Sequence, residues 1–600
     1  MIKFYFTFLL FPAFIFGQTK RPVATNITGI TDYSTELVFT DAFKQCRTWT
    51  TFNSDGDGPW DTGASVTMLP NGFPTEVPFD GGVGQAQKVR ALMVWEIGDA
   101  RPHGKYRLIV KGKGKVGLQF GAEGEFVCPI DTLVEVNGSV SLSIEYSDKN
   151  DPISDVKFIY PRYVNTFEGQ TFNDDFLQFL SDFECLRFMD WQRTNNSVLE
   201  KWADRASLDY YTQATDKGIA YEYIVELCNQ LKKNAWICIP HRAEDDYVRQ
   251  LASFLHTHLD PSLTIYLEYS NEVWNGIFAQ HYESAQMALE SGYTGTEWER
   301  AWKWTAKRSA DIFSIFEQEF GDDSHLVKII PTQAANSWLT NEIITFFNDP
   351  LYNPTQVTAD AIAIAPYFGG EVAQDIVNEG LVSSITVPEI VARMEASLPV
   401  TYEWMRLQKE VANQHTLDLI CYEGGQHLVG IGGNENIDEL TEKLIATNHH
   451  PDLQAVYCQY LDHWYENAGG LFAHFSSHDS YSKWGSWGVK ENYTDTLNPK
   501  YLALKNCVFA YNGTSNIKEN YTNSTKIQAF PNPASSEQIF ISGVEPGSML
   551  VLTNLAGHKI LSTIVRGEES QQTVHLSERG VYILHISNKN KINQLKVVRM

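Results

Sequence analysis

The chain has 600 residues, more than one ordinary domain, and 43% of them are hydrophobic, which is enough for a large buried core. Its formal net charge of −26 at pH 7 argues against nucleic acids and strongly anionic polymers as partners, because clustered Lys and Arg bind such polymers. Aromatic residues make up 13% of the chain, which favours either a carbohydrate ligand, whose apolar ring faces stack on aromatic side chains, or a core rich in Trp.

The first residues have the pattern of an export signal. Lys3 precedes an apolar stretch from Phe4 to Phe16, and Gly17 follows it. This order predicts a signal peptide over residues 1–17 that is cleaved on export. No lipobox-type Cys follows, so we expect no lipid anchor. We also expect no transmembrane segment, because no later window reaches about eighteen consecutive apolar residues.

The next part of the chain changes from one apolar segment to an alternating pattern. Residues 37–53 are interpreted as the first strand of a barrel. From about 58 to 160 the sequence is rich in Gly and Val, and apolar side chains occupy every second position at Val140, Leu142 and Ile144. We therefore expect a β-sandwich over residues 58–160, inserted in the barrel or packed on it.

After Phe167, strand-like runs alternate with helix-like segments, which predicts βαβ units and a parallel sheet. Helices are expected at 245–256, 278–290, 297–319, 387–396 and 437–446. Strands are expected at 184–189, 235–240, 263–271, 326–331, 359–367, 417–423 and 470–475. With the 37–53 segment these strands make a (β/α)8 TIM barrel from residues 18–57 and 161–510, whose active site lies at the carboxyl ends of the strands.

Two glutamates stand at the ends of predicted strands. Glu272 follows Asn271 at the end of one strand, and Glu423 ends another. Either glutamate alone fits a solvated carboxylate or a salt-bridge partner. Together they fit a retaining glycosidase, which uses one carboxyl group as acid/base and one as nucleophile. Because strand residues alternate between faces, Asn271 and Glu272 can share a site only if the strand curls or bulges at its end.

The segment around Glu272 reads Glu-Tyr-Ser-Asn-Glu-Val-Trp-Asn, and with Glu423 it resembles the clan A glycoside hydrolases over roughly residues 30–505. The resemblance is to an uncharacterised subgroup with a β-rich insertion near the N-terminus. It implies that Glu272 is the acid/base, that Glu423 is the nucleophile, and that Asn271 binds the sugar hydroxyl next to the reacting carbon. It implies no cofactor.

Other strand ends supply further candidate substrate-binding residues. Arg187 is expected either to hold Glu423 ionised or to form a structural salt bridge. The resemblance to clan A also implies a Tyr or His near the nucleophile, and His241 and Tyr367 are the candidates for it. Stacking on sugar and filling of the core remain alternatives for several aromatic residues. The candidate Trp residues are Trp274, Trp338, Trp484 and Trp487.

The eight cysteines show no spacing typical of a disulfide framework. Cys185, Cys238 and Cys421 lie in predicted strands, and we interpret them as small buried residues. The chain has neither a CxxC nor an HExxH motif, so no metal site is expected.

The C-terminal residues form a separate predicted unit. A polar linker over 511–526 precedes an all-β segment over 527–600 that contains Phe-Pro-Asn-Pro from Phe530, a Gly-Val-Tyr-Ile strand from Gly580 and a basic last strand. This unit resembles the sorting domain of type IX secretion in Bacteroidetes-type bacteria; the alternative is a small sugar-binding β-domain. The resemblance implies the secretion machinery as a partner, and a protein secreted or attached to the cell surface after export through the outer membrane.

The resulting hypothesis is a secreted retaining glycoside hydrolase that cleaves a polysaccharide, with endo action. The alternatives are a non-catalytic carbohydrate-binding protein on a degenerate glycosidase barrel, and a polysaccharide lyase on the same barrel.

Overall fold

The computed structural model describes residues 21–510 except 96, 98 and 99, and residues 528–530, 538–542, 544, 548–554, 559–565, 571–576, 579–588 and 591–599. The predicted signal peptide and linker lie outside the described residues. The chain divides into two compact units, Met1–Asn512 and Gly513–Met600. Among the described helices, none is long and apolar enough to span a membrane.

The first unit contains a closed barrel of eight parallel strands in the order β1-β15-β14-β13-β12-β11-β10-β9. This confirms the expected TIM barrel, and seven of the strands overlap the predicted segments. The barrel strands are β1 (Val23–Asn26), β9 (Cys185–Arg187), β10 (Asn234–Ile239), β11 (Ile265–Tyr269), β12 (Leu326–Pro331), β13 (Ala361–Ile364), β14 (Asp418–Gly424) and β15 (Phe472–His474).

The prediction of the first barrel strand was wrong. The strand is β1, whose four residues are all buried and which lies between β15 and β9. Leu37 and Phe43 of the 37–53 segment instead enter the core of the N-terminal sheet, whereas Val38 and Phe39 pack in the core that includes the barrel. Thr50–Asn53 forms β2, which pairs antiparallel with β4 (Ala86–Met93). A strand as short as β1 has too few residues to show a periodic pattern.

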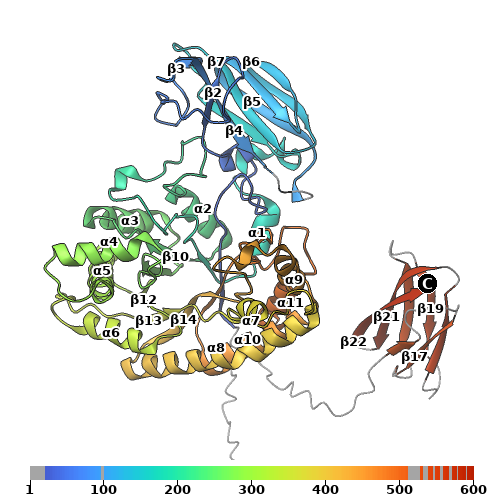
Figure 1. The fold of residues 1–600 in the computed structure, drawn as a ribbon. Coiled ribbons are helices and arrows are strands. Elements are labelled where there is room, and N and C mark those ends of the chain that lie inside the picture. The colour runs from blue at the N-terminus through green and yellow to red at the C-terminus, as the bar shows by residue number, and fades with distance from the viewer. Residues whose placement is uncertain are drawn as a thin grey trace, which may run out of the picture. The chain divides into compact units, whose positions relative to one another are not determined.

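Helices surround the barrel strands in Figure 1. They are α1 (Asp174–Leu180), α2 (Tyr221–Leu231), α3 (Asp245–His258), α4 (Ala279–Glu290), α5 (Glu297–Phe320), α6 (Ser337–Asn348), α7 (Val372–Asn378), α8 (Val387–His415), α9 (Asp438–Asn448), α10 (Leu453–His463) and α11 (Pro499–Ala503). The longest, α8, runs past its predicted end at Ala396 and through Pro399. Proline removes one helical hydrogen bond. Leu398 before Pro399, and Thr401 and Met405 after it, are buried and hold the helix against the core.

The region expected to be a β-sandwich over residues 58–160 is one continuous antiparallel sheet. It includes β2, β3 (Phe79–Asp80), β4, β5 (Gly104–Phe120), β6 (Gly124–Val136), β7 (Val140–Ser147) and β8 (Asp155–Ile159). β5 pairs with β6 on one side, and on the other it pairs first with β8 and then with β7. Alternate residues such as Val116, Leu142 and Phe158 are fully buried in the core of this sheet. The period of two in the sequence therefore reflects a sheet with one apolar face.

The second unit contains two antiparallel sheets. One has the order β16 (Gln528–Phe530), β17 (Gln538–Ser542), β20 (Gln571–His575), and the other β19 (Lys559–Ile564), β18 (Met549–Asn554), β21 (Gly580–Asn588), β22 (Lys591–Arg599). Buried side chains from both sheets, including Ile539, Leu552 and Leu584, form one core. Where the structure describes this unit, it is all-β, as predicted.

The cysteines differ in part from the prediction. Cys458 on α10 and Cys507, near the end of the first unit, form a disulfide with a Cα–Cα distance of 5.7 Å, whereas the sequence showed no framework. Their separation of 49 residues has no recognisable spacing, and only the fold brings them together. Cys185, Cys238 and Cys421 are buried and unpaired, as expected.

Candidate active site

The curl at the end of β11 is present. The strand ends at Tyr269, and the backbone then has φ values of +57° at Ser270 and +45° at Glu272. Positive φ is uncommon for residues other than Gly, so this turn departs sharply from extended geometry. The side chains of Asn271 and Glu272 consequently both meet partners from the barrel interior, Arg187 and Tyr422.

Glu272 lies in an environment that favours its protonated form. Burial and, second, the negative charge of Glu423 raise the pKa of Glu272 to about 7. Two hydrogen bonds oppose this rise in pKa, from the Tyr422 hydroxyl to Oε1 and from Asn275 Nδ2 to Oε2, each 2.9 Å long. A carboxyl group with this pKa retains a substantial fraction of its proton at neutral pH and can serve as a general acid.

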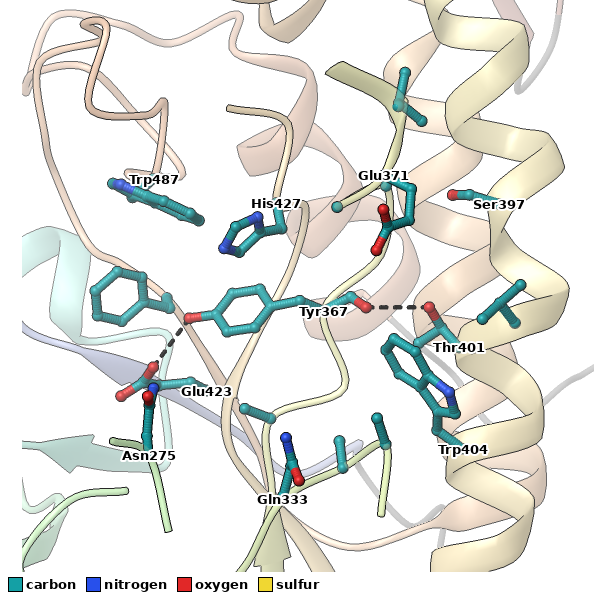
Figure 2. A pocket seen from close by; sticks show the side chains of 18 of the residues that line it. Asn275, Gln333, Tyr367, Glu371, Ser397, Thr401, Trp404, Glu423, His427 and Trp487 are labelled. Carbon is teal, nitrogen blue, oxygen red and sulfur yellow. Dashed lines mark hydrogen bonds between the residues drawn. The ribbon is translucent and has the colours of Figure 1, made fainter. Parts of the chain in front are cut away.

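Glu423 is held at both oxygens. Arg187 Nη1 donates to Oε1 at 2.8 Å, and the Tyr367 hydroxyl donates to Oε2 at 3.0 Å. Figure 2 shows the Tyr367 side chain reaching Glu423 across the floor of the cavity. Burial and the neighbouring carboxyl groups raise the pKa of Tyr367 well above its usual range, so its hydroxyl remains a donor. The Glu423 carboxylate is therefore fixed in position by one cation and one neutral donor.

Arg187 is completely buried and links the two strand ends. Its Nη2 donates to Glu268 Oε2 at 2.9 Å and to Asn271 Oδ1 at 2.9 Å, and its Nη1 also donates to Asn26 Oδ1 at 2.8 Å. Burial lowers the pKa of Arg187, but Glu268 and Glu423 more than offset it, so the pKa lies well above its usual value. Arg187 therefore contacts Glu423 and also forms a buried salt bridge with Glu268.

The two glutamates line one cavity of about 840 Å³. Its floor lies at the ends of β11 to β15, and one wall is formed by α7 and α8. Much of the lining is aromatic, including Trp274, Tyr367 and Trp487. Trp274 Nε1 is buried and has no hydrogen-bond partner among the described residues. The cavity thus offers flat apolar faces and an unused donor beside Glu272.

The remaining predicted residues fall into two groups. Arg187 and Asn271 lie beneath the cavity and contact its carboxylate or each other. His241, Trp338 and Trp484 are outside the lining. His241 is buried with Nε2 at 2.5 Å from Glu283 Oε2. Trp338 is 59% exposed and packs against Trp302, and Trp484 is 67% exposed.

Several residues of the site were not predicted. Asn26 was missed together with β1, and Trp404 lies on the part of α8 beyond its predicted end. Tyr422 directly precedes Glu423 in the sequence, and its hydroxyl contacts Glu272. Asn275 stands three residues after Glu272, and this spacing was the one available signal for it. Across the described residues no group of three or more His, Cys, Asp or Glu is arranged to hold a metal ion.

Comparison with known proteins gives two kinds of similarity. Residues 528–599 match the family model "Secretion system C-terminal sorting domain". The protein is therefore exported through the outer membrane and is secreted or attached to the cell surface. No curated protein sequence matches the chain.

Solved structures are similar to the chain at low identity. A calcium-binding mutant of Bacteroides uniformis beta-glucuronidase 2 is 12% identical, with 86% of this chain and 59% of that chain covered and a TM-score of 0.33. The endo-beta-1,4-mannanase from Thermotoga petrophila is 10% identical, with 70% and 93% covered and a TM-score of 0.32. PorZ, a surface component of the type IX secretion system of Porphyromonas gingivalis, is 15% identical with a TM-score of 0.12; 13% of this chain is covered, and the chain spans 12% of PorZ.

Proposed function

We propose that the Met1–Asn512 unit is a glycoside hydrolase that cleaves a polysaccharide with net retention, with Glu423 as nucleophile and Glu272 as acid/base. The observation that carries this proposal is that two carboxyl groups in one cavity have different environments. The pKa of Glu272 is raised to about 7, whereas Glu423 accepts hydrogen bonds from Arg187 and Tyr367. Glycosidases assign acid and nucleophile by such differences in environment.

In the first step, Glu423 attacks the anomeric carbon while Glu272 gives its proton to the departing glycosidic oxygen. The glycosidic bond breaks, an ester forms between the sugar and Glu423, and the shortened chain leaves as an alcohol. In the second step, Glu272 removes a proton from water, the water oxygen attacks the anomeric carbon, and the ester to Glu423 breaks. Two displacements at one carbon restore its original configuration.

Asn271 is proposed to bind the hydroxyl next to the anomeric carbon. Its Oδ1 accepts from Arg187 at 2.9 Å, and its Nδ2 donates to Asn195 Oδ1 at 3.1 Å, so both ends of the amide are oriented. A contact of this kind strengthens in the transition state and contributes to rate rather than to ground-state binding alone.

Export and the aromatic lining support a polymeric substrate. A secreted or surface enzyme meets polysaccharides before they are broken down, and the lining residues Trp274, Trp404 and Trp487 provide stacking faces at several points of the cavity. Endo action is proposed on the same grounds.

The test is a depletion assay on a panel of plant and algal polysaccharides. We expect the wild-type enzyme to release reducing ends from at least one polymer, and Glu423→Gln to bind that polymer without releasing product. Glu272→Gln should lose about 10²- to 10⁴-fold in turnover, the usual contribution of general acid–base catalysis.

Glu283→Gln serves as the matched control, since Glu283 contacts His241 outside the cavity. Binding by the wild type without any product would instead support a binding protein. Products that absorb ultraviolet light as unsaturated uronic acids would support a lyase.

A further inference from the structure

The cavity extends well beyond the two glutamates. From the loop after β13 and the start of α7 it is lined by Glu371 and Asp375, and from α8 by Ser397, Thr401 and Trp404. The α8 residues in the lining recur at intervals of three and four, so a single face of the helix forms this wall. None of these residues takes part in the proposed bond cleavage.

The α8 wall is fixed relative to the nucleophile. Thr401 Oγ1 donates to the Tyr367 carbonyl oxygen at 3.1 Å, and the Tyr367 hydroxyl donates to Glu423 at 3.0 Å. Figure 2 shows this chain of contacts running from Glu423 through Tyr367 to α8, with Trp404 beside Thr401. A sugar unit resting on this wall would therefore lie at a defined distance from the reacting bond.

The wall has space and a stacking face. Ala396, Ser397 and Val400 have small side chains and leave room beside the helix, while Trp404 presents an indole to the same cavity. Figure 2 also shows the Glu371 side chain in the space between His427 and Ser397. The Glu371 carboxylate has no hydrogen-bond or ion-pair partner among the described residues.

The charges of the lining are unbalanced toward the negative. Glu272, Glu371, Asp375 and Glu423 are all acidic. The lining cation Arg393 is already paired with Glu379, at 2.6 Å between Nη2 and Oε2. Burial lowers the pKa of His427, so its imidazole is neutral at neutral pH. A uronate or sulfate ester entering here would meet the exposed carboxylates of Glu371 and Asp375. It would find no unpaired cation among the lining residues, all of which the structure describes.

We infer that the space between the loop after β13 and α8 is a subsite for an uncharged sugar unit, which stacks on Trp404 and donates hydroxyl hydrogen bonds to Glu371. Glu371 is the specificity-determining residue of this subsite, because its free carboxylate repels anionic sugar units. The natural substrate is accordingly a neutral polysaccharide. This inference rests on the proposed hydrolase function.

The test compares substrates that differ in one group. The probe is the neutral hexose polymer that the enzyme cleaves best among β-glucans, β-mannans and galactans, together with the same polymer after partial oxidation of its primary hydroxyls to carboxylates. We expect the wild-type kcat/KM to be lower for the oxidised form by about two- to tenfold, because the carboxylates of the lining repel the added negative charges. High ionic strength should reduce this preference.

Glu371→Gln is expected to raise KM for the neutral polymer and to reduce the preference against the oxidised form about two- to fivefold, the size expected for one exposed charge. Glu410→Gln makes the same charge change on an exposed face of α8, outside the cavity, and should match the wild type.

Trp404→Ala should raise KM about two- to tenfold with little change in kcat, because stacking contributes equally to substrate and transition state. Trp338→Ala, an exposed Trp outside the cavity, should leave both constants unchanged.

The outcomes separate this inference from the function on which it rests. Hydrolysis of alginate, polygalacturonate or carrageenan as fast as the best neutral polymer would overturn the inference and leave the hydrolase intact. A Glu371→Gln variant that prefers the neutral polymer over the oxidised form as strongly as the wild type does would also overturn the inference and leave the hydrolase function intact. Failure of the wild type to hydrolyse any of these polymers would remove both.

Discussion

At the scale of single residues, the chemistry of the site depends on which hydroxyl meets which carboxyl group. Tyr422 donates to Glu272, and Tyr367 donates to Glu423. The hydrogen bond from Tyr422 stabilises the ionised form of Glu272 and so limits how far burial raises its pKa. The remaining rise sets the pKa of the proposed acid near neutrality, where proton donation is efficient.

This arrangement predicts a defined pH dependence. Because Glu272 must be protonated and its pKa is about 7, kcat/KM should fall as the pH rises through about 7. Tyr422→Phe removes a hydrogen bond to the ionised form, so the pKa of Glu272 should rise and the alkaline limb should move to higher pH by about half to one unit. The measurement is the pH profile of kcat/KM for both proteins.

Tyr247→Phe is the control for this experiment, since its buried hydroxyl contacts Tyr221 and neither glutamate. An alkaline limb that stays in place or moves to lower pH in Tyr422→Phe would contradict the assignment of Glu272 as the acid.

At the scale of elements, both strands that carry the glutamates are irregular at their ends. β11 is followed by positive φ at Ser270 and Glu272, and the pairing of β14 with β15 shifts register between Cys421 and Gly424. Regular strands would send neighbouring residues to opposite faces. The irregular ends let Asn271 with Glu272, and Tyr422 with Glu423, serve one site.

Breaking the buried salt bridge between Arg187 on β9 and Glu268 on β11 should lower the free energy of unfolding strongly. Arg187 and Glu268 are both fully buried and form a salt bridge of 2.9 Å between Nη2 and Oε2. Glu268→Leu would leave the Arg187 charge compensated by Glu423 alone, so we expect a loss of about 3–5 kcal/mol in the free energy of unfolding. Glu410→Gln, which breaks an exposed pair with Arg406, should cost less than about 1 kcal/mol.

Chemical denaturation at neutral pH measures both values. Equal, small losses in the two variants would show that the buried pair does not hold β9 against β11.

The sequence predicted those elements whose burial leaves a long apolar run. Seven barrel strands and the helices α3, α4, α5 and α9 follow from such patterns. β1 was missed because four residues are too few to show a periodic pattern. The full extent of α8 was missed because a proline such as Pro399 usually indicates the end of a helix. The disulfide depends on tertiary contact between Cys458 and Cys507, which sequence spacing does not reveal.

The candidate site was predictable where a residue stands at the end of a strand. Glu272, Tyr367 and Glu423 line the cavity because parallel strands of a barrel end at one rim. The directions of loop side chains follow from local packing, so Trp487 lies in the cavity whereas Trp484 is exposed, although both belong to one loop. His241 also follows a strand, but Glu283 on α4 holds it away from the cavity.

At the scale of the whole molecule, chemistry and export belong to different units. The proposed site lies entirely within Met1–Asn512, and the sorting domain lies within Gly513–Met600. Each unit has its own buried core, which is the mark of domains that fold independently.

We therefore expect a chain that ends at Asn512 to keep the kcat/KM and the thermal midpoint of the first unit. In a bacterium with type IX secretion, the full chain should reach the medium or the cell surface, whereas the shortened chain should remain inside the outer membrane. Fractionation followed by an activity assay measures both effects. Loss of activity in the shortened chain would contradict the separation, as would its export.

The central claim is double displacement by Glu423 with Glu272 as acid/base, and the stereochemistry of the first product tests it most directly. Proton NMR of the reaction, recorded before the released sugar equilibrates, identifies the anomer that forms at the new reducing end. The account predicts the same anomeric configuration as in the substrate. Initial release of the opposite anomer would show a single displacement by water and would contradict the role of Glu423 as nucleophile.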